Sequence, residues 1–296
     1  MSYHRLHKLL PASQANFPLL RALLRGTAAR VALGAGLLSS LAAPALALDP
    51  NTKDARAIAK AVEDRESGDR IVSRVTLTLQ DAAGRKRVRK LNQQSLKFDG
   101  GTRSIIFFEA PADVRNTGLL SVDFDDGKKE DDQWLYLPSL HKSTRISTSD
   151  RSGSFMGTDL TYSDMTKKDP EQYDYAIIEQ SVKVDGEDCW LLEARPRSEK
   201  EKKETGYVKT HTWISKSKLM PVQVKAWVKE GKKLKYMKFS NFEKIDGIWV
   251  AKRLAVRTVR GGKVDSQTLL ETNTMKFNQA SVTESQFSER RLEQGL

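Results

Sequence analysis

The chain has 296 residues, with 50 Lys and Arg against 38 Asp and Glu, so its formal net charge is +12. One cysteine excludes an intrachain disulfide framework and any zinc or iron–sulfur site built from several cysteines, and four histidines leave little for a metal cluster. The hydrophobic fraction of 39% is low for a globular chain but too high for a disordered one, so we expect a core beneath a densely charged surface.

Residues 1–47 differ from the rest of the chain. They hold five basic side chains and no acid, with an apolar run over residues 31–41 and small residues that lead up to Ala47. This order is typical of a cleavable signal peptide, and the apolar run is too short for a membrane-spanning helix. We therefore expect residues 1–47 to be a signal peptide cleaved near Ala47 and residues 48–296 to be a single exported domain.

Without residues 1–47 the chain keeps 45 basic and 38 acidic side chains, so its net charge falls to +7. The most basic stretch, residues 85–90, has five positive charges in six residues and no aromatic residue among them. Nucleic-acid binding favours aromatic residues between the basic ones, and export also argues against such a partner. We interpret the stretch as a solvent-exposed strand face, with docking to an acidic partner or to anionic lipid as an additional role.

The first predicted element of the exported chain is a helix over residues 51–67. Its apolar side chains recur at the spacing of one helical face, and they are Ala55, Ile58, Ala59 and Val62. Asn51 or Thr52 is expected to cap the first turn, and Gly68 to end the helix.

From Ile71 onward apolar and polar side chains alternate, which predicts strands. The first strand contains Val75, Leu77 and Leu79, and the later ones cover residues 87–98, 104–109, 119–124, 133–137, 175–184, 189–195, 208–215, 222–229, 233–243, 249–259 and 266–277. Glycine-containing turns separate them, among them 81–84, 99–101, 185–186, 230–231, 246–247 and 261–262, as is typical of hairpins. Consecutive strands without intervening helices predict an antiparallel meander and disfavour a parallel α/β fold.

One face of these strands is apolar, and a single helix is too small to cover it. We expect a mainly β fold, in which a strongly curved antiparallel sheet wraps its apolar face around the helix and around a long loop at residues 147–173 with one or two short helices. Such sheets commonly enclose a ligand cavity. The candidate cavity residues are Val75, Leu77, Leu79, Phe108, Trp134, Tyr136, Trp190, Leu192, Val222, Val224, Val250 and Leu254. From sequence alone the same residues serve equally well as ordinary core.

Signals for catalysis are weak. Neither His141 nor His211 has a metal-ligand spacing to a second ligand, and we expect His211 on an exposed strand face. No nucleophile elbow or phosphate-binding glycine loop is present, so we predict no catalytic, cofactor-binding or metal-binding residues. Residues 123–127 hint at a calcium loop, but a solvated hairpin turn fits them better. Cys189 is expected to be buried beside Trp190 rather than reactive.

One combination of motifs is unusual. D-D-Q-W-L-Y-L-P-S-L at residues 131–140 and R-I at 145–146 are followed by S-F-M-G-T-D-L-T-Y-S-D-M at 154–165. Together with residues 111–118 and 246–250, these motifs resemble the bacterial outer membrane lipoprotein-sorting protein family, relatives of the periplasmic lipoprotein carrier LolA. The resemblance covers residues 71–287.

The resemblance implies a half-open antiparallel β-barrel with a helical lid over an apolar cavity. It also implies a non-enzymatic periplasmic carrier that takes the acyl chains of a lipoprotein or a free lipid toward the outer membrane. The implied partner is an inner-membrane transporter of the resistance-nodulation-division (MMPL-like) type. No cofactor is implied, no nucleic acid is expected, and transient contact with a membrane surface is a further expectation.

The loop at residues 147–173 is the candidate lid, because carriage requires a cover that opens on docking. Its predicted lid residues are Phe155, Met156, Gly157, Leu160 and Tyr162, with Gly153 and Gly157 as hinges. Lys142, Arg145 or Arg151 is expected to pair with a lipid phosphate or with an acidic transporter surface.

Two alternatives from other classes stay open. An exported hydrolase on the same sheet predicts a polar cleft, for instance one in which Asp159 and Asp164 converge. An envelope interaction module attached to a transporter predicts a cavity that the protein's own side chains fill.

Overall fold

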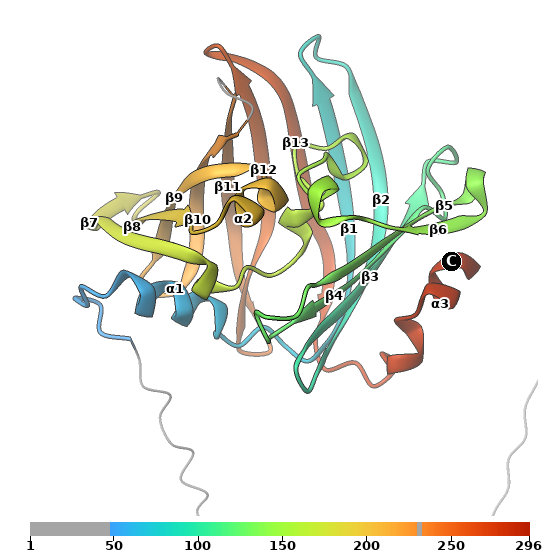
Figure 1. The fold of residues 1–296 in the computed structure, drawn as a ribbon, viewed down its shortest axis with the longest axis horizontal. Helices are drawn as coiled ribbons and strands as arrows, with labels where there is room; N and C mark the ends of the chain where they lie inside the picture. Colours follow the sequence, from blue (N-terminus) through green and yellow to red (C-terminus); the bar gives the residue numbers. More distant parts are fainter. Residues whose placement is uncertain (1–47, 230–232) are drawn as a thin grey trace, which may run out of the picture. The chain divides into compact units, whose positions relative to one another are not determined.

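The computed structural model describes residues 48–229 and 233–296, so the predicted signal peptide and the turn predicted at residues 230–231 lie outside the described residues. The described chain is dominated by an antiparallel sheet of thirteen strands (Figure 1). No helix in this part of the chain is long and apolar enough to cross a membrane.

The strands are β1 (Arg70–Asp81), β2 (Lys86–Phe98), β3 (Gly101–Ala110), β4 (Gly118–Phe124), β5 (Asp132–Leu137), β6 (Lys142–Arg145), β7 (Tyr173–Val184), β8 (Glu187–Pro196), β9 (Tyr207–Ser215), β10 (Met220–Val228), β11 (Lys233–Ile245), β12 (Ile248–Arg260) and β13 (Lys263–Lys276). The helices are α1 (Ala55–Glu63), α2 (Glu199–Thr205) and α3 (Glu289–Gln294). Short 3₁₀ turns are η1 (Pro138–Leu140), η2 (Thr148–Asp150), η3 (Phe155–Gly157), η4 (Ser163–Met165), η5 (Pro170–Gln172) and η6 (Glu284–Gln286).

The strand order is β6-β5-β4-β3-β2-β1-β13-β12-β11-β10-β9-β8-β7. The first and last strands therefore pair in the middle, from Val72 opposite Lys276 to Asp81 opposite Ser266. The two edge strands, β6 and β7, do not pair with each other, so the sheet is curved but not closed. The prediction of a strongly curved antiparallel meander is confirmed. The strand β6 and the helices α2 and α3 were not predicted.

The path from β6 to β7 is a segment of residues 146–172, which we call the crossover segment. It contains four short 3₁₀ turns, η2 to η5, where one or two short helices were expected. In Figure 1 it passes between the two halves of the curved sheet. We call the sheet face that contacts the crossover segment the inner face and the opposite face the outer face.

The helix α1 is shorter than predicted because its cap lies later in the chain. Asp54, rather than Asn51 or Thr52, accepts hydrogen bonds from the backbone N–H groups of Arg56 and Ala57. This satisfies two of the unpaired donors of the first turn. Ala55 and Ile58 then pack against the inner-face side chains Trp190, Leu192 and Ile214.

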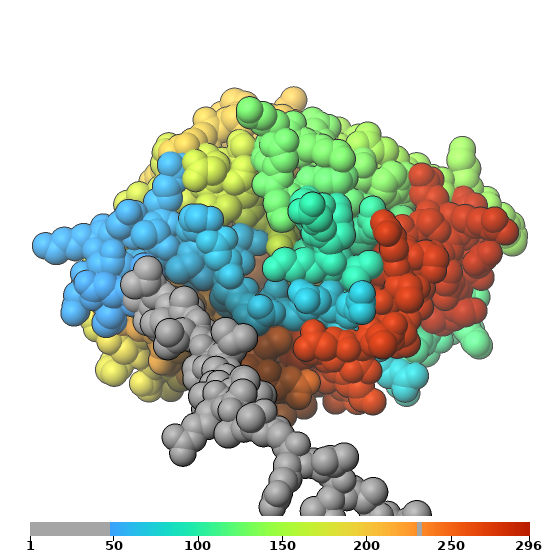
Figure 2. Space-filling view, turned by 90° about the horizontal axis from the view of Figure 1, so that it is seen from below, coloured from blue at the N-terminus to red at the C-terminus, as the bar shows by residue number. Residues whose placement is uncertain are grey.

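The outer face of β2 to β5 is covered by the end of the chain. Residues 277–296, which we call the C-terminal cover, contain η6 and α3. The cover's buried side chains Val282, Phe287 and Leu292 pack against Leu96, Ile105, Phe107, Leu120 and Tyr136 of the sheet. Figure 2 shows the cover in red beside the blue-green strands of the first half.

Candidate functional site

The crossover segment lies against the inner face of both halves of the sheet. On the first half Phe155 is buried with its ring 5.9 Å from that of Phe108, and Tyr162 stacks edge-on against it at 5.8 Å. The buried Arg89 of β2 donates to the carbonyl oxygen of Met156 at 2.6 Å. On the second half Leu160 packs into a cluster with Tyr207, Ala226, Met237 and Val256.

A buried carboxylate anchors the middle of the segment. Asp159 is 6% exposed and accepts hydrogen bonds from the hydroxyls of Thr258, Ser266 and Thr268, the last at 2.6 Å. Its backbone N–H donates to Thr268 Oγ1 at 2.9 Å. These partners come from β12 and β13, so four hydrogen bonds tie one residue of the crossover segment to the centre of the sheet. A buried carboxylate with fully paired oxygens avoids the desolvation penalty of an unpaired one.

A second anchor lies five residues further along the chain, at Asp164. The hydroxyl of Tyr207 donates to Asp164 Oδ2 at 2.7 Å, and the Lys235 ammonium lies 3.7 Å from the same oxygen. Burial lowers the pKa of Lys235, and burial together with the Asp164 charge raises the pKa of Tyr207 well above its usual value. Asp159 and Asp164 thus bind separate partners and do not converge in one polar cleft.

The start of the segment is fixed by Arg151, which is 2% exposed. Its guanidinium forms an ion pair with Glu204 of α2 and donates to the backbone oxygen of Asp131. Arg151 was expected to meet a lipid phosphate or a partner's acidic surface, and that expectation is wrong, because its charge is already neutralised inside the protein. Arg145 likewise pairs with Asp132, whereas Lys142 lies exposed on β6.

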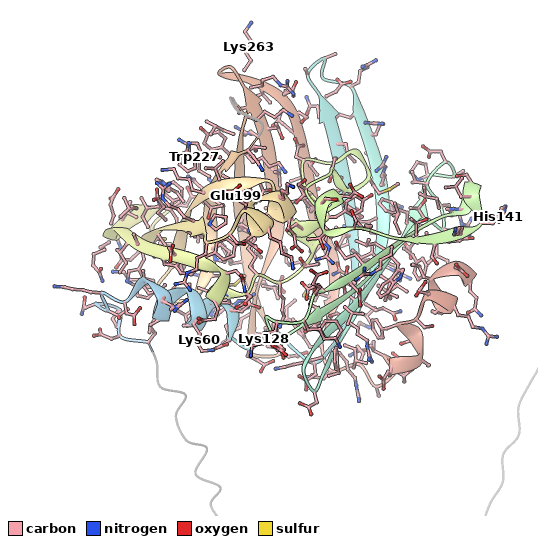
Figure 3. The ribbon with its side chains drawn as sticks, viewed as in Figure 1. Lys60, Lys128, His141, Glu199, Trp227 and Lys263 are labelled. Carbon is pink, nitrogen blue, oxygen red and sulfur yellow. The ribbon has the colours of Figure 1, made fainter. Side chains whose placement is uncertain are left out.

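Two clefts border the crossover segment. The first, of about 570 Å³, lies between α1, the β4–β5 turn, the second half of the segment and α2. Figure 3 labels Lys60 and Lys128 at its rim. Basic and acidic side chains alternate around this cleft, which we call the α1–α2 cleft. It is therefore lined mainly by charge rather than by apolar side chains.

The most perturbed group in the α1–α2 cleft is Asp123 on the inner face of β4. Burial, and secondarily the nearby Asp131, raises the pKa of Asp123 to about 8. Its Oδ1 atom has no hydrogen-bond partner among the described residues. A carboxyl group that favours its neutral form is a poor cation ligand, so the hairpin-turn interpretation of residues 123–127 fits better than a calcium loop. The described residues contain no group of three or more acidic, His or Cys side chains placed to hold a metal ion.

The second cleft, of about 500 Å³, lies between the first half of the crossover segment and strands β9 to β13. We call it the crossover cleft. Its lining includes the lysines Lys203, Lys229, Lys233 and Lys235, together with the buried Leu160 and Tyr207 and the anchor Asp159. It leads from a basic opening toward the apolar inner face.

The predicted cavity residues do not all share one surface. Val75, Leu77, Leu79 and Phe108 lie on the inner face with Phe155, and Val224 and Leu254 lie on the inner face of the other half with Leu160. Trp190 and Leu192 are covered by α1. Val222 is buried at an irregularity of β10, and Val250 is half-buried on β12.

Trp134 and Tyr136 were predicted to line the cavity, but both lie on the outer face under the C-terminal cover. Strand alternation explains the difference: the intervening Leu135 is the β5 side chain that packs with the inner cluster. The aromatic residues of the W-x-Y motif therefore belong to the outer core.

The predicted lid residues lie in the crossover segment, which packs against the inner face. Phe155 and Leu160 are buried, Met156 and Tyr162 are half-buried, and Gly157 is exposed with positive φ. Within the described residues the apolar inner face is thus packed against the segment. The polar partners of the two anchors form no sequence motif and were not predicted; they are Thr258, Ser266, Thr268, Tyr207 and Lys235.

Cys189 is fully buried beside Trp190, as predicted, and burial raises its pKa to about 11. His211 is not on a freely exposed face: its Nε2 atom lies 2.8 Å from Glu193 Oε2, and its ring is 4.6 Å from that of Trp227. Lys209, His211 and Arg195 together hold the pKa of Glu193 at about 2.

Comparisons with known proteins agree with this architecture. A family model described as an uncharacterized protein matches residues 100–294. The chain is 28% identical to an outer membrane lipoprotein-sorting protein domain from Vibrio parahaemolyticus, covering 81% of this chain and 98% of that one with a TM-score of 0.72. A DUF1329 family protein from Desulfovibrio piger is also 28% identical, with 82% and 99% coverage and a TM-score of 0.73. No protein of curated function matches the sequence.

The fold itself is also found in a LolA superfamily protein from Nitrosomonas europaea. That protein is 21% identical and covers 80% of this chain and 98% of its own, with a TM-score of 0.60. At this identity the likeness concerns the fold alone.

Proposed function

Because the chain belongs to a LolA-related family of outer membrane lipoprotein-sorting proteins, we propose that it is a non-enzymatic periplasmic carrier of acyl chains. One observation carries the proposal: the sheet is half-open, and its apolar inner face is covered by a segment whose middle is anchored through polar side chains. Such a cover can be exchanged for a lipid without unfolding the sheet.

The energetics favour exchange over a permanently open cavity. Burial of an acyl chain stabilises the complex by about 0.8 kcal/mol for each methylene. A whole chain therefore compensates for the contacts that Phe155 and Leu160 lose on the inner face. When the segment moves away, the carboxylate and hydroxyl groups around Asp159 regain hydrogen bonds from water. The protein thereby avoids exposing an empty apolar cavity between rounds of transport.

We further propose that the cargo is a lipid or lipoprotein that the chain shuttles toward the outer membrane. An inner-membrane transporter of the resistance-nodulation-division (MMPL-like) type is the proposed donor, and residues 1–47 are the proposed signal for export. The similarity to the lipoprotein-sorting protein domain from Vibrio parahaemolyticus supports this proposal.

The direct test is lipid extraction and mass spectrometry of chain purified from the periplasm without detergent. We expect lipid to accompany the wild-type protein and to be lost in Leu77→Asp, which places a carboxylate on the sheet surface that the acyl chain would contact. Ile178→Asp is the matched control, because Ile178 is 47% exposed on the edge strand β7, and the control is expected to keep its lipid.

A second measurement does not depend on the folding of a variant. A photoreactive fatty acid added to the wild-type chain is expected to crosslink to peptides that contain Leu77, Phe108 or Leu254. A lipid-free extract from folded protein, together with no crosslink on the inner face, would favour an interaction module that binds no small ligand. Crosslinks confined to the outer face would place the acyl site elsewhere.

A further inference from the structure

A band of basic and aromatic side chains crosses the outer face of the sheet from β9 through β13 and β1 to β2. The strand register places Lys86, Gln80, Gln267, Arg257, Tyr236, Lys225 and His211 in one row over seven adjacent strands. In the neighbouring row Trp227 lies opposite Lys209. We call Lys86, Arg257, Tyr236, Lys225, Trp227 and Lys209 the basic band.

The band's aromatic rings lie among its cations. The ammonium groups of Lys209 and Lys225 are 4.5 and 4.6 Å from the Trp227 ring centroid, and Lys225 is 5.8 Å from that of Tyr236. Glu193 neutralises Lys209, whereas Lys86, Lys225 and Arg257 have no carboxylate partner within the described part of the chain. The C-terminal cover contacts β2 at Leu96, ten residues from Lys86, so no segment among the described residues shields the band.

Two hairpin tips extend the positive surface beyond the band. The β1–β2 tip carries Arg85, Lys86 and Arg87, all exposed, and the β12–β13 tip carries Arg260 and Lys263. Figure 1 shows both hairpins projecting at the same end, and Figure 3 labels Lys263 at the outermost point. Among the described residues, Asp81 and Asp265 offset part of this charge through ion pairs with Arg85 and Arg260.

Exposed apolar side chains lie on the same two hairpins. Val88 is 52% exposed on β2 and Val264 is 45% exposed on β13, two of the most exposed large hydrophobic residues in the described chain. Basic side chains beside Trp, Tyr and exposed aliphatic groups are the composition of proteins that lie in the headgroup region of a bilayer. An acidic protein surface would pair with the charges but would give no reason for valines at the tips.

We propose that the basic band and the two hairpin tips bind the surface of a bilayer that contains anionic phospholipid. In the β12–β13 tip, Arg260 lies two residues from Thr258 and Lys263 lies three residues from Ser266, and both Thr258 and Ser266 line the crossover cleft. Docking at this end therefore brings the basic opening of that cleft next to the lipid headgroups. The docking does not require the chain to carry acyl chains, so it can hold even where the proposed function fails.

The test is co-sedimentation of the purified chain, its N-terminal residue fixed by intact mass, with two kinds of vesicle. We expect binding to phosphatidylcholine vesicles that contain phosphatidylglycerol and little binding to phosphatidylcholine alone. Added salt should reduce the binding, because exposed charges are screened. Lys86→Glu combined with Arg257→Glu should weaken binding by at least about tenfold, since each basic residue at such a surface contributes roughly fivefold.

The matched control is Lys128→Glu combined with Lys183→Glu. It makes the same change in net charge at exposed lysines of the β4–β5 turn and of β7, away from the band. The control should bind like wild type. Equal binding to both vesicle types, equal loss in the control, or no binding of the wild type would overturn the proposal. If the wild type does not bind, an acidic protein becomes the next partner to test at the basic band. Lipid extraction tests the carrier function separately.

Discussion

Two segments outside the sheet cover its apolar faces, and they do so by different chemistry. The C-terminal cover holds the outer face through buried apolar side chains, Val282, Phe287 and Leu292, while its glutamates stay exposed. The crossover segment holds the inner face through Phe155 and Leu160, and also through buried ionisable and hydroxyl groups.

The difference indicates which cover is built to move. The buried contact between the C-terminal cover and the sheet is mainly hydrophobic, and water offers no compensation when that surface is exposed. Separating the crossover segment exposes Asp159, Asp164 and Arg151, which recover solvation when they leave. We therefore expect the outer core to set the stability of the protein and the inner anchors to set the position of the crossover segment.

The largest effect should come from Leu292→Ala in the C-terminal cover. Leu292 is fully buried among the outer-core residues, and a substitution of this type costs about 2–5 kcal/mol, or roughly 5–15 °C in Tm for a domain of this size. Urea and thermal unfolding measure the loss. Lipid content should stay unchanged, because the cavity left behind lies on the outer face. A variant as stable as wild type would contradict the assignment of this segment to the core.

Asp159→Asn should lower the free energy of unfolding by a smaller amount, and its effect should lie in the crossover segment. The amide offers one acceptor oxygen where the carboxylate offers two, so at least one of the hydroxyls of Thr258, Ser266 and Thr268 loses its partner. The expected loss is about 1–3 kcal/mol. Hydrogen exchange should rise in the crossover segment and not in the C-terminal cover.

Glu284→Gln is the matched control for that experiment. It makes the same carboxylate-to-amide change at an exposed residue of the C-terminal cover, where Glu284 pairs with Arg103. Exposed pairs of this kind contribute about 0–1 kcal/mol. Equal increases in hydrogen exchange in both segments for both variants would contradict the expectation that the inner anchors set the position of the crossover segment.

The two covers also differed in how far the sequence predicted them. Strand alternation indicated one apolar face that contains Leu77, and the crossover segment was singled out because residues 147–173 interrupt that alternation. The C-terminal helix α3 was missed because its six residues carry little periodicity and depend on Ser288 and on packing against the sheet. The anchors of Asp159 were missed because Thr258 and Ser266 become partners only when β12 and β13 pair.

The pH dependence of stability should also come from the inner face of the sheet, through Asp123 of β4. The folded-state pKa of Asp123 is raised to about 8 from 3.8, so the folded protein binds the proton more tightly than the unfolded chain. The resulting stability is fully present below about pH 4 and is lost as the pH rises through about 8, at up to ~1.4 kcal/mol per pH unit. Asp123→Asn should remove this slope in urea titrations between about pH 5 and about pH 9.

Asp125→Asn serves as the control for the pH experiment. Asp125 is exposed two residues later in the same turn region, so its substitution should leave the slope as in wild type. A slope that persists in Asp123→Asn would assign the pH dependence to other buried groups of the α1–α2 cleft. Glu63 and Glu201, whose pKa values burial also raises, would be the next to replace.

The smallest expected loss of stability comes from two matched serine-to-alanine variants. Each cover depends on one short helix with a serine cap, α3 for the C-terminal cover and α2 for the crossover segment. Ser288 Oγ accepts from the Arg291 N–H at 3.2 Å in α3, and Ser198 Oγ accepts from the Glu201 N–H at 3.1 Å in α2. Each Ser→Ala change should cost about 1 kcal/mol. Only Ser198→Ala should also raise hydrogen exchange around Arg151, because α2 supplies its partner Glu204. Equal exchange around Arg151 in both variants would mean that α2 does not hold the start of the crossover segment in place.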